Sequence, residues 1–193
     1  MTILFKLLRK RAGRTIDPLH VSMTGVKMGE RFVMIGCDDR ALIAGLASKV
    51  GLSGVAAVAA FDDAGADRAK AVGAKIGALI EVRPIERGAL SFDSDSFDMA
   101  VIDDTRGRFA SLSSDDRSSC LREARRVVRA GGRIEVVEGL GGGLFGNVAR
   151  PTGYEAAREL IAAGFNPVRL LAERDSFRFV EGLKGAALSP SST

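Results

Sequence analysis

Acidic residues follow several predicted strands of this chain, and one of those strands runs directly into a glycine turn. Residues 31–40 read Arg-Phe-Val-Met-Ile-Gly-Cys-Asp-Asp-Arg, an apolar strand, then Gly36, then a helix pattern. Such a turn is typical of nucleotide-type α/β domains, because glycine lets the backbone pass close to a bound cofactor. These turns usually carry two or three glycines, whereas Asp38 and Arg40 stand at the later positions here. Two interpretations stay open: a rebuilt cofactor cradle, or an Asp38-Asp39-Arg40 cluster that only caps the helix.

The elements that must position these residues alternate between strand and helix. The predicted strands are 32–35, 55–61, 78–82, 97–103 and 133–138. The predicted helices are 41–50, 64–76, 114–129 and 152–163. A predicted hairpin of strands 168–173 and 177–181 ends the pattern. Alternation of this kind implies a parallel sheet with right-handed crossovers. The predicted fold class is therefore α/β: a Rossmann-like, doubly wound, mostly parallel seven-stranded sheet with a C-terminal antiparallel hairpin strand.

The predicted topology also indicates where a ligand would bind. In open α/β sheets, ligands lie outside the carboxyl ends of the strands. That rule gathers the segments Gly36–Arg40, Phe61–Asp63, Arg83–Arg87 and Asp103–Arg106 around one cleft.

The composition indicates one globular domain in a reduced, cytoplasmic setting. The chain has 193 residues, enough for a core, and Cys37 and Cys120 lie far apart without metal-type spacing. We see no signal peptide, and apolar stretches such as 54–61 are too short to span a bilayer. Nucleic acid is not favoured as a partner, because Trp is absent and Tyr occurs once, which leaves few aromatic rings for stacking bases.

The net charge of +4 is concentrated at the start of the chain. Residues 3–14 combine Lys and Arg with Ile, Leu and Phe in the pattern of a short basic amphipathic helix. One interpretation is peripheral contact with an anionic membrane surface or RNA; the other is an arm that packs on its own domain, or on a protein partner or second copy. The predicted organisation is an arm and connector over 1–27, a main domain over 28–184 and a disordered tail over 185–193.

Five segments together resemble the class I S-adenosylmethionine-dependent methyltransferases, in the small-molecule branch of quinone biosynthesis. They are Gly29–Cys37, Asp62 after the second strand, Leu90–Asp98, Glu123–Arg133 and Gly164–Lys184. Leu90–Asp98 reads Leu-Ser-Phe-Asp-Ser-Asp-Ser-Phe-Asp, similar to the family's Leu-Pro-Phe-x-Asp-x-Ser-Phe-Asp. The order and spacing of all five, rather than any one, carry the resemblance.

The resemblance implies S-adenosylmethionine as cofactor and assigns cofactor contacts to Gly36, Cys37, Asp38, Asp62, Asp63, Glu86, Arg87 and Asp103. Gly36 and Cys37 would line the methionine end, and Asp62 would bind the ribose. Glu86 would meet the adenine amino group, with pairing to Arg87 at the surface as the alternative. Asp103 and Asp104 would lie beside the transferred methyl group.

Two functions follow from the resemblance. The first is S-adenosylmethionine-dependent methyl transfer to a small, apolar acceptor; no catalytic residue is assigned, because this chemistry needs mainly positioning. The second is a degenerate relative that has lost cofactor binding and acts through a protein or membrane partner, as Asp38 and Arg40 suggest. A nicotinamide dehydrogenase is disfavoured because Gly-x-Gly-x-x-Gly is missing. No metal set is expected, and His20 is the sole histidine.

Overall fold

The computed structural model describes residues 18–86, 88–141 and 151–185. Its helices are α2 (Pro18–Met23), α3 (Arg40–Val50), α4 (Asp63–Ile76), α5 (Ser114–Val127) and α6 (Ala156–Ala162). Its strands are β1 (Arg31–Ile35), β2 (Val55–Ala60), β3 (Ile80–Glu86), β4 (Ala89–Leu90), β5 (Phe97–Asp104), β6 (Val128–Gly139), β7 (Val168–Arg174) and β8 (Phe177–Leu183). The predicted arm at 3–14, most of the loop after Gly139 and residues 186–193 lie outside the described ranges.

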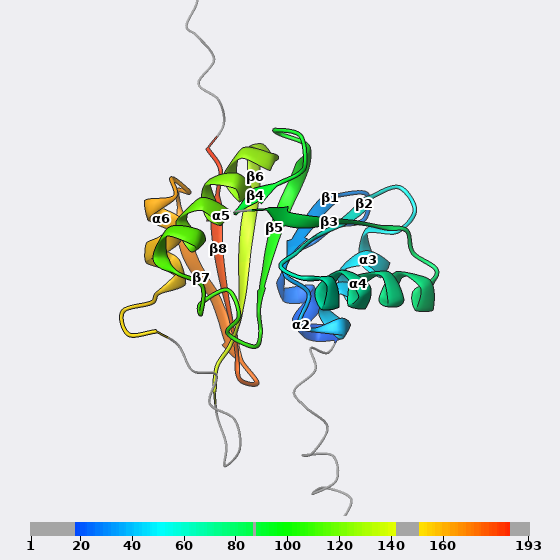
Figure 1. Cartoon of the computed structure of the whole chain (residues 1–193), viewed down its shortest axis with the longest axis horizontal. Coiled ribbons are helices and arrows are strands. Elements are labelled where there is room, and N and C mark those ends of the chain that lie inside the picture. The colour runs from blue at the N-terminus through cyan, green and yellow to red at the C-terminus, as the bar shows by residue number, and fades with distance from the viewer. Residues whose placement is uncertain (1–17, 87, 142–150, 186–193) are drawn as a thin grey trace, which may run out of the picture.

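The described strands form one sheet in the order β4-β3-β2-β1-β5-β6-β8-β7 (Figure 1). β1 pairs in parallel with β2 and β5, β2 with β3, and β5 with β6, whereas β8 is antiparallel to both β6 and β7. The predicted Rossmann-like class and its antiparallel hairpin are confirmed. The sheet has eight strands rather than seven because β3 turns back on itself through the two-residue β4.

Several element boundaries differ from the prediction. β3 continues past Val82 to Glu86, where Ile85 and Glu86 pair with β4. α5 ends at Val127 rather than at residue 129, and β6 begins at Val128 rather than at residue 133, because Val128 is already extended and pairs with Phe97. α6 begins only at Ala156, after an N-cap residue that makes no side-chain capping bond.

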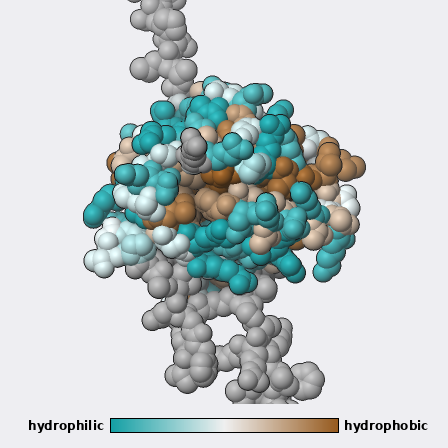
Figure 2. All heavy atoms as spheres, in the orientation of Figure 1, coloured by the Kyte–Doolittle hydropathy of each residue, from teal (hydrophilic) through white to brown (hydrophobic). Residues whose placement is uncertain are grey.

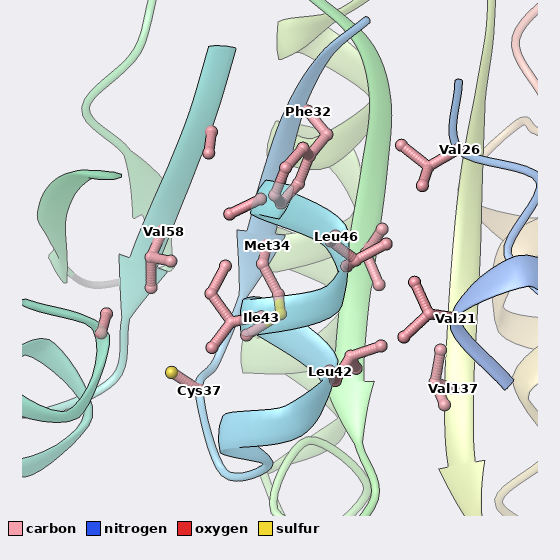
Figure 3. Packing of buried hydrophobic residues seen from close by; sticks show 14 of the residues in the cluster. Val21, Val26, Phe32, Met34, Cys37, Leu42, Ile43, Leu46, Val58 and Val137 are labelled. Carbon is pink, nitrogen blue, oxygen red and sulfur yellow. The ribbon is translucent and has the colours of Figure 1, made fainter. Parts of the chain in front are cut away.

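Helices cover both faces of the sheet, so the domain has three layers. Helices α2, α3 and α4 pack on one face, and α5 and α6 pack on the other, over β6 and β8 (Figure 1). Figure 3 shows Leu42, Ile43 and Leu46 of α3 directed at the strands, with Val21 and Val26 between α3 and β6. Val21 and Val26 are 4% and 1% exposed, so part of the predicted connector belongs to the core.

The sole histidine lies in this core layer. His20 of α2 is buried, and its ring contacts those of Phe177 and Phe179, with centroids 5.3 and 6.1 Å away. Its Nε2 lies 3.3 Å from a carboxylate oxygen of Asp175. These contacts fasten α2 to β8.

A buried carboxyl group lies on the same face of the sheet. Glu135 of β6 is fully buried and sits opposite Glu181 of β8 in the strand register. Glu181 is bound by Arg169 of β7 at 2.7 Å, whereas neither oxygen of Glu135 has a hydrogen-bond partner in the part of the chain that the structure describes. Burial, and then repulsion from Glu181, raises the pKa of Glu135 to about 8.

The end of β6 passes very close to the loop after β5. A Cβ placed on Gly139 would overlap the carbonyl oxygen of Thr105 and lie 2.8 Å from its carbonyl carbon. Glycine is therefore required here for close backbone approach rather than for an unusual φ.

The surface seen in Figure 2 mixes hydrophilic side chains with an apolar band across the middle of that face. Large exposed apolar side chains include Met28, Leu52, Leu79, Ile161 and Leu170. Among the described helices, none has both the length and the hydropathy to cross a membrane.

Candidate functional site

The carboxyl ends of β2, β1 and β5 bring three acidic loops together. The three strands are parallel neighbours, so the turn after Ile35 lies between the loop after Ala60 and the loop after Asp104. The predicted gathering of residues 36–40, 61–63 and 103–106 is therefore found in the structure.

The turn between β1 and α3 is held by glycine geometry and by a helix cap. Gly36 has φ +82°, and its N–H donates to Ala59 O at 2.9 Å. A Cβ on Gly36 would lie 3.1 Å from the ring of Phe61. Asp39 caps α3, accepting from the amides of Ala41 and Leu42 at 2.7 and 3.1 Å. Within the Asp38-Asp39-Arg40 cluster it is thus Asp39 that fixes the start of the helix.

Asp103 binds this turn from the neighbouring strand. Its Oδ2 accepts from the amides of Asp38 and Asp39 at 2.7 and 2.8 Å. Its Oδ1 accepts from the hydroxyl and amide of Thr105 at 2.6 and 3.2 Å. The side chain is fully buried, so the structure shows Asp103 as a brace for the turn.

The adjacent Asp104 is also fully buried and also serves a loop. Its Oδ1 accepts from the amide of Ala110 at 3.0 Å, which fixes the chain between β5 and α5. Both carboxylates at the end of β5 thus bind backbone groups of the protein itself.

Asp38 is neutralised by an arginine that the sequence analysis did not single out. Arg68 of α4 lies 3.3 Å from Asp38 Oδ1, and its Nε donates to the carbonyl of Cys37. Arg40, at the start of α3, is exposed. Burial, and then the charge of Asp103, raises the pKa of Asp38. Burial likewise raises the pKa of the Cys37 thiol to about 12.

Asp62 begins α4 and forms an ion pair across the site. Its Oδ1 accepts from the amide of Gly65 at 2.7 Å, and its Oδ2 lies 2.8 Å from a guanidinium nitrogen of Arg108. Both contacts lower its pKa, the Gly65 bond most. Arg108 also lies over the ring of Phe61, 5.5 Å from the centroid. One feature of the sequence could have indicated Arg68 and Arg108. Acidic residues follow neighbouring strands, and carboxylates that become buried there need nearby cations.

A hollow of about 330 Å³ opens beside this ion pair, between the ends of β2 and β3. Its lining consists of Ala60, Phe61, Asp62, Asp63, Ala66, Lys70, Val82, Arg83 and Pro84. The volume is at the lower end of what ligand pockets span, roughly 300–1,000 Å³. Glu86 is exposed and does not line this hollow, and Arg87 lies outside the described residues. Of the predicted site residues that the structure describes, all except Glu86 are therefore brought together.

Many solved structures share this fold, among them two S-adenosylmethionine-dependent methyltransferases and a cyclase. A S-adenosylmethionine-dependent methyltransferase from Aquifex aeolicus superposes with a TM-score of 0.72 at 20% identity, covering 87% of this chain and 89% of that one. A TehB-like S-adenosylmethionine-dependent methyltransferase from Corynebacterium glutamicum gives 0.61 at 15%, covering 95% of each chain. The [4+2]-cyclase SpnF gives 0.64 at 13%, covering 91% and 84%. At these identities the likeness shows the fold alone: a Rossmann-like methyltransferase fold.

The sequence itself gives the family. Residues 14–179 match the ubiE/COQ5 methyltransferase family, and the chain belongs to that family. No curated protein matches the chain.

The cofactor implied by this family can be tested against the residues present. The nucleoside end fits the hollow, where Asp62 and Asp63 offer carboxylate oxygens for hydroxyl groups. The amino-acid end fits poorly, because the amides of Asp38 and Asp39 are already bound by Asp103, and the carboxylates of Asp38, Asp39 and Asp103 already lie at the turn.

Proposed function

We propose that this chain is a S-adenosylmethionine-dependent methyltransferase acting on a small, apolar acceptor. The observation that carries the proposal is the hollow at the ends of β2 and β3, lined by Asp62 and Asp63, in a member of a methyltransferase family. In this proposal the adenosine portion occupies the hollow, and Asp62 exchanges its contact with Arg108 for the ribose hydroxyls. The cofactor supplies an already activated methyl group, so the residues of this chain need mainly to position it and to exclude water.

A second candidate is favoured by the occupied turn. The amides of Asp38 and Asp39 donate to Asp103, and Arg68 forms an ion pair with Asp38, so these groups have partners without a ligand. That arrangement supports a family member that has lost cofactor binding and acts through a partner.

Calorimetric titration with S-adenosylmethionine and S-adenosylhomocysteine decides between the two. If the first proposal holds, both bind, and a ligand at 100 times its dissociation constant adds about 2.7 kcal/mol to the stability of the fold in thermal melts. No binding at millimolar ligand by a folded protein would contradict methyl transfer and support the second candidate.

We predict that Asp62→Asn weakens the binding of S-adenosylhomocysteine by about tenfold or more, because a charged acceptor for hydroxyl groups is lost. Asparagine keeps an oxygen for the amide of Gly65, so α4 stays capped. The matched control is Asp67→Asn, since that carboxylate lies on the same helix with its side chain 79% exposed. Equal dissociation constants for both variants, measured by calorimetry, would remove Asp62 from the site.

A further inference from the structure

Four backbone amides, two just before α3 and two in its first turn, are bound by carboxylates of this same chain. Asp103 accepts from the amides of Asp38 and Asp39, and Asp39 accepts from those of Ala41 and Leu42. The amino end of a helix is where an anionic group of a ligand is ordinarily stabilised, by unpaired amides and by the helix dipole. Here these four amides already donate hydrogen bonds to carboxylates of the protein.

The charges around the turn oppose a further anion. Asp103 is fully buried, and the side chain of Asp38 is 9% exposed. Among the described cations that act on Asp38, Arg68 is engaged by Asp38 and by the carbonyl of Cys37, Arg108 pairs with Asp62, and Arg106 is exposed. A ligand carboxylate would add to the negative charges of Asp38, Asp39 and Asp103 in this confined space, and like charges at such distances repel strongly.

The neighbouring hollow is not obstructed in this way. It is lined by the ring of Phe61, by small or apolar residues including Ala60 and Val82, and by the charged residues Asp62, Asp63, Lys70 and Arg83. The same Phe61 ring also lies against the Gly36 turn. A flat, hydroxyl-bearing group suits the hollow, whereas a carboxylate at the turn would meet four amides that already donate to carboxylates of the protein.

We propose that Asp103 takes the place of a ligand carboxylate, so that this site prefers adenosine-type nucleosides without an amino-acid group over those that carry one. Asp103 is then a specificity-determining residue that acts through the turn. The inference rests on the nucleoside site of the proposed function and is independent of methyl transfer.

The test compares 5′-methylthioadenosine with S-adenosylhomocysteine, which share the adenosine and the thioether and differ in the amino-acid portion. Dissociation constants are measured for the wild type, Asp103→Asn and Asp98→Asn. Asp98 is the matched control, because it lies on the same strand and accepts a backbone amide, that of Arg31, at 2.8 Å at the opposite end of the sheet.

The wild type is expected to bind methylthioadenosine about tenfold more tightly than S-adenosylhomocysteine. Asp103→Asn is expected to reduce that ratio by about tenfold, and Asp98→Asn to leave it unchanged. A general loss of stability would weaken both ligands together and would not move the ratio.

Each other outcome overturns the inference in a recognisable way. Tighter binding of S-adenosylhomocysteine by the wild type overturns it while leaving the proposed function standing. Binding of neither nucleoside overturns the inference and the proposed nucleoside site together. An unchanged ratio of dissociation constants in folded Asp103→Asn shows that Asp103 is not the determinant. If that variant does not fold, the inference is tested by the wild-type ratio and by Asp38→Asn, which removes another carboxylate of the turn.

Discussion

Replacing Glu135 with glutamine is expected to stabilise the protein by roughly 3–5 kcal/mol at pH 8.5 and to change little near pH 4.5. Burial, and then the charge of Glu181, raises the pKa of Glu135 from 4.5 to about 8 in the folded protein. Between these values the folded chain holds a proton that the unfolded chain has released, so the free energy of unfolding falls as the pH rises. Glutamine removes the ionisation and therefore this loss.

Urea unfolding at pH 4.5 and 8.5 measures the effect. The matched control is Glu173→Gln, which removes an exposed carboxylate of β7, in the same sheet, that pairs with Arg178. Glu181 keeps its contact with Arg169 in both variants, so the difference between them isolates the buried group. Parallel stability changes for the two variants at both pH values would show that Glu135 ionises as an exposed carboxyl group does.

Replacing Gly139 with alanine is expected to destabilise the fold by about 3 kcal/mol or more, since the new methyl group overlaps a carbonyl rather than a movable side chain. The overlap with Thr105 is relieved only if the ends of β5 and β6 separate. Residues 103–105 are the part of β5 and its loop that braces the turn, so separation also disturbs Asp103.

Thermal and urea unfolding of Gly139→Ala measure the loss, with Gly185→Ala as the control. A Cβ at Gly185 meets no atom within 4 Å, so that variant should match the wild type within about 0.5 kcal/mol. If Gly139→Ala also left the free energy of unfolding unchanged, the close approach of the end of β6 to Thr105 would not exist in solution.

The elements with local signals could be predicted from the sequence. Strand β1 and helix α3 begin and end within about one residue of the predicted positions, because Gly36 and Asp39 mark the turn chemically. The buried faces of α3 and α4 agree with helical spacing, since Leu42 and Leu46 lie four residues apart and are buried, as is Ala69 of α4. The end of α5 was missed because Val128 pairs with Phe97, a distant residue that helical spacing does not reveal.

The site was predictable in its location but not in its connections. Strand ends converge by topology, so the acidic loops could be placed together in advance. The bond from the Asp38 amide to Asp103 spans 65 residues, and no local pattern distinguishes it from a solvent-facing carboxylate. The ion pair of Asp38 with Arg68 likewise depends on how α4 approaches the β1 turn, which packing decides.

The alanines of β2 have a consequence for how the molecule opens. β2 reads Val-Ala-Ala-Val-Ala-Ala and is almost wholly buried, but its small side chains offer few dispersion contacts. Strand β3, the next strand of the sheet after β2, has no fully buried residue, and Leu79, just before β3, is 94% exposed. Local unfolding requires least free energy where buried apolar contact is sparse. Amide hydrogens of β3 and α4 should therefore exchange with solvent through local unfolding that leaves β1, β5 and β6 folded. Strand β3 and helix α4, which both contribute residues to the lining of the hollow, would then unfold locally as one unit.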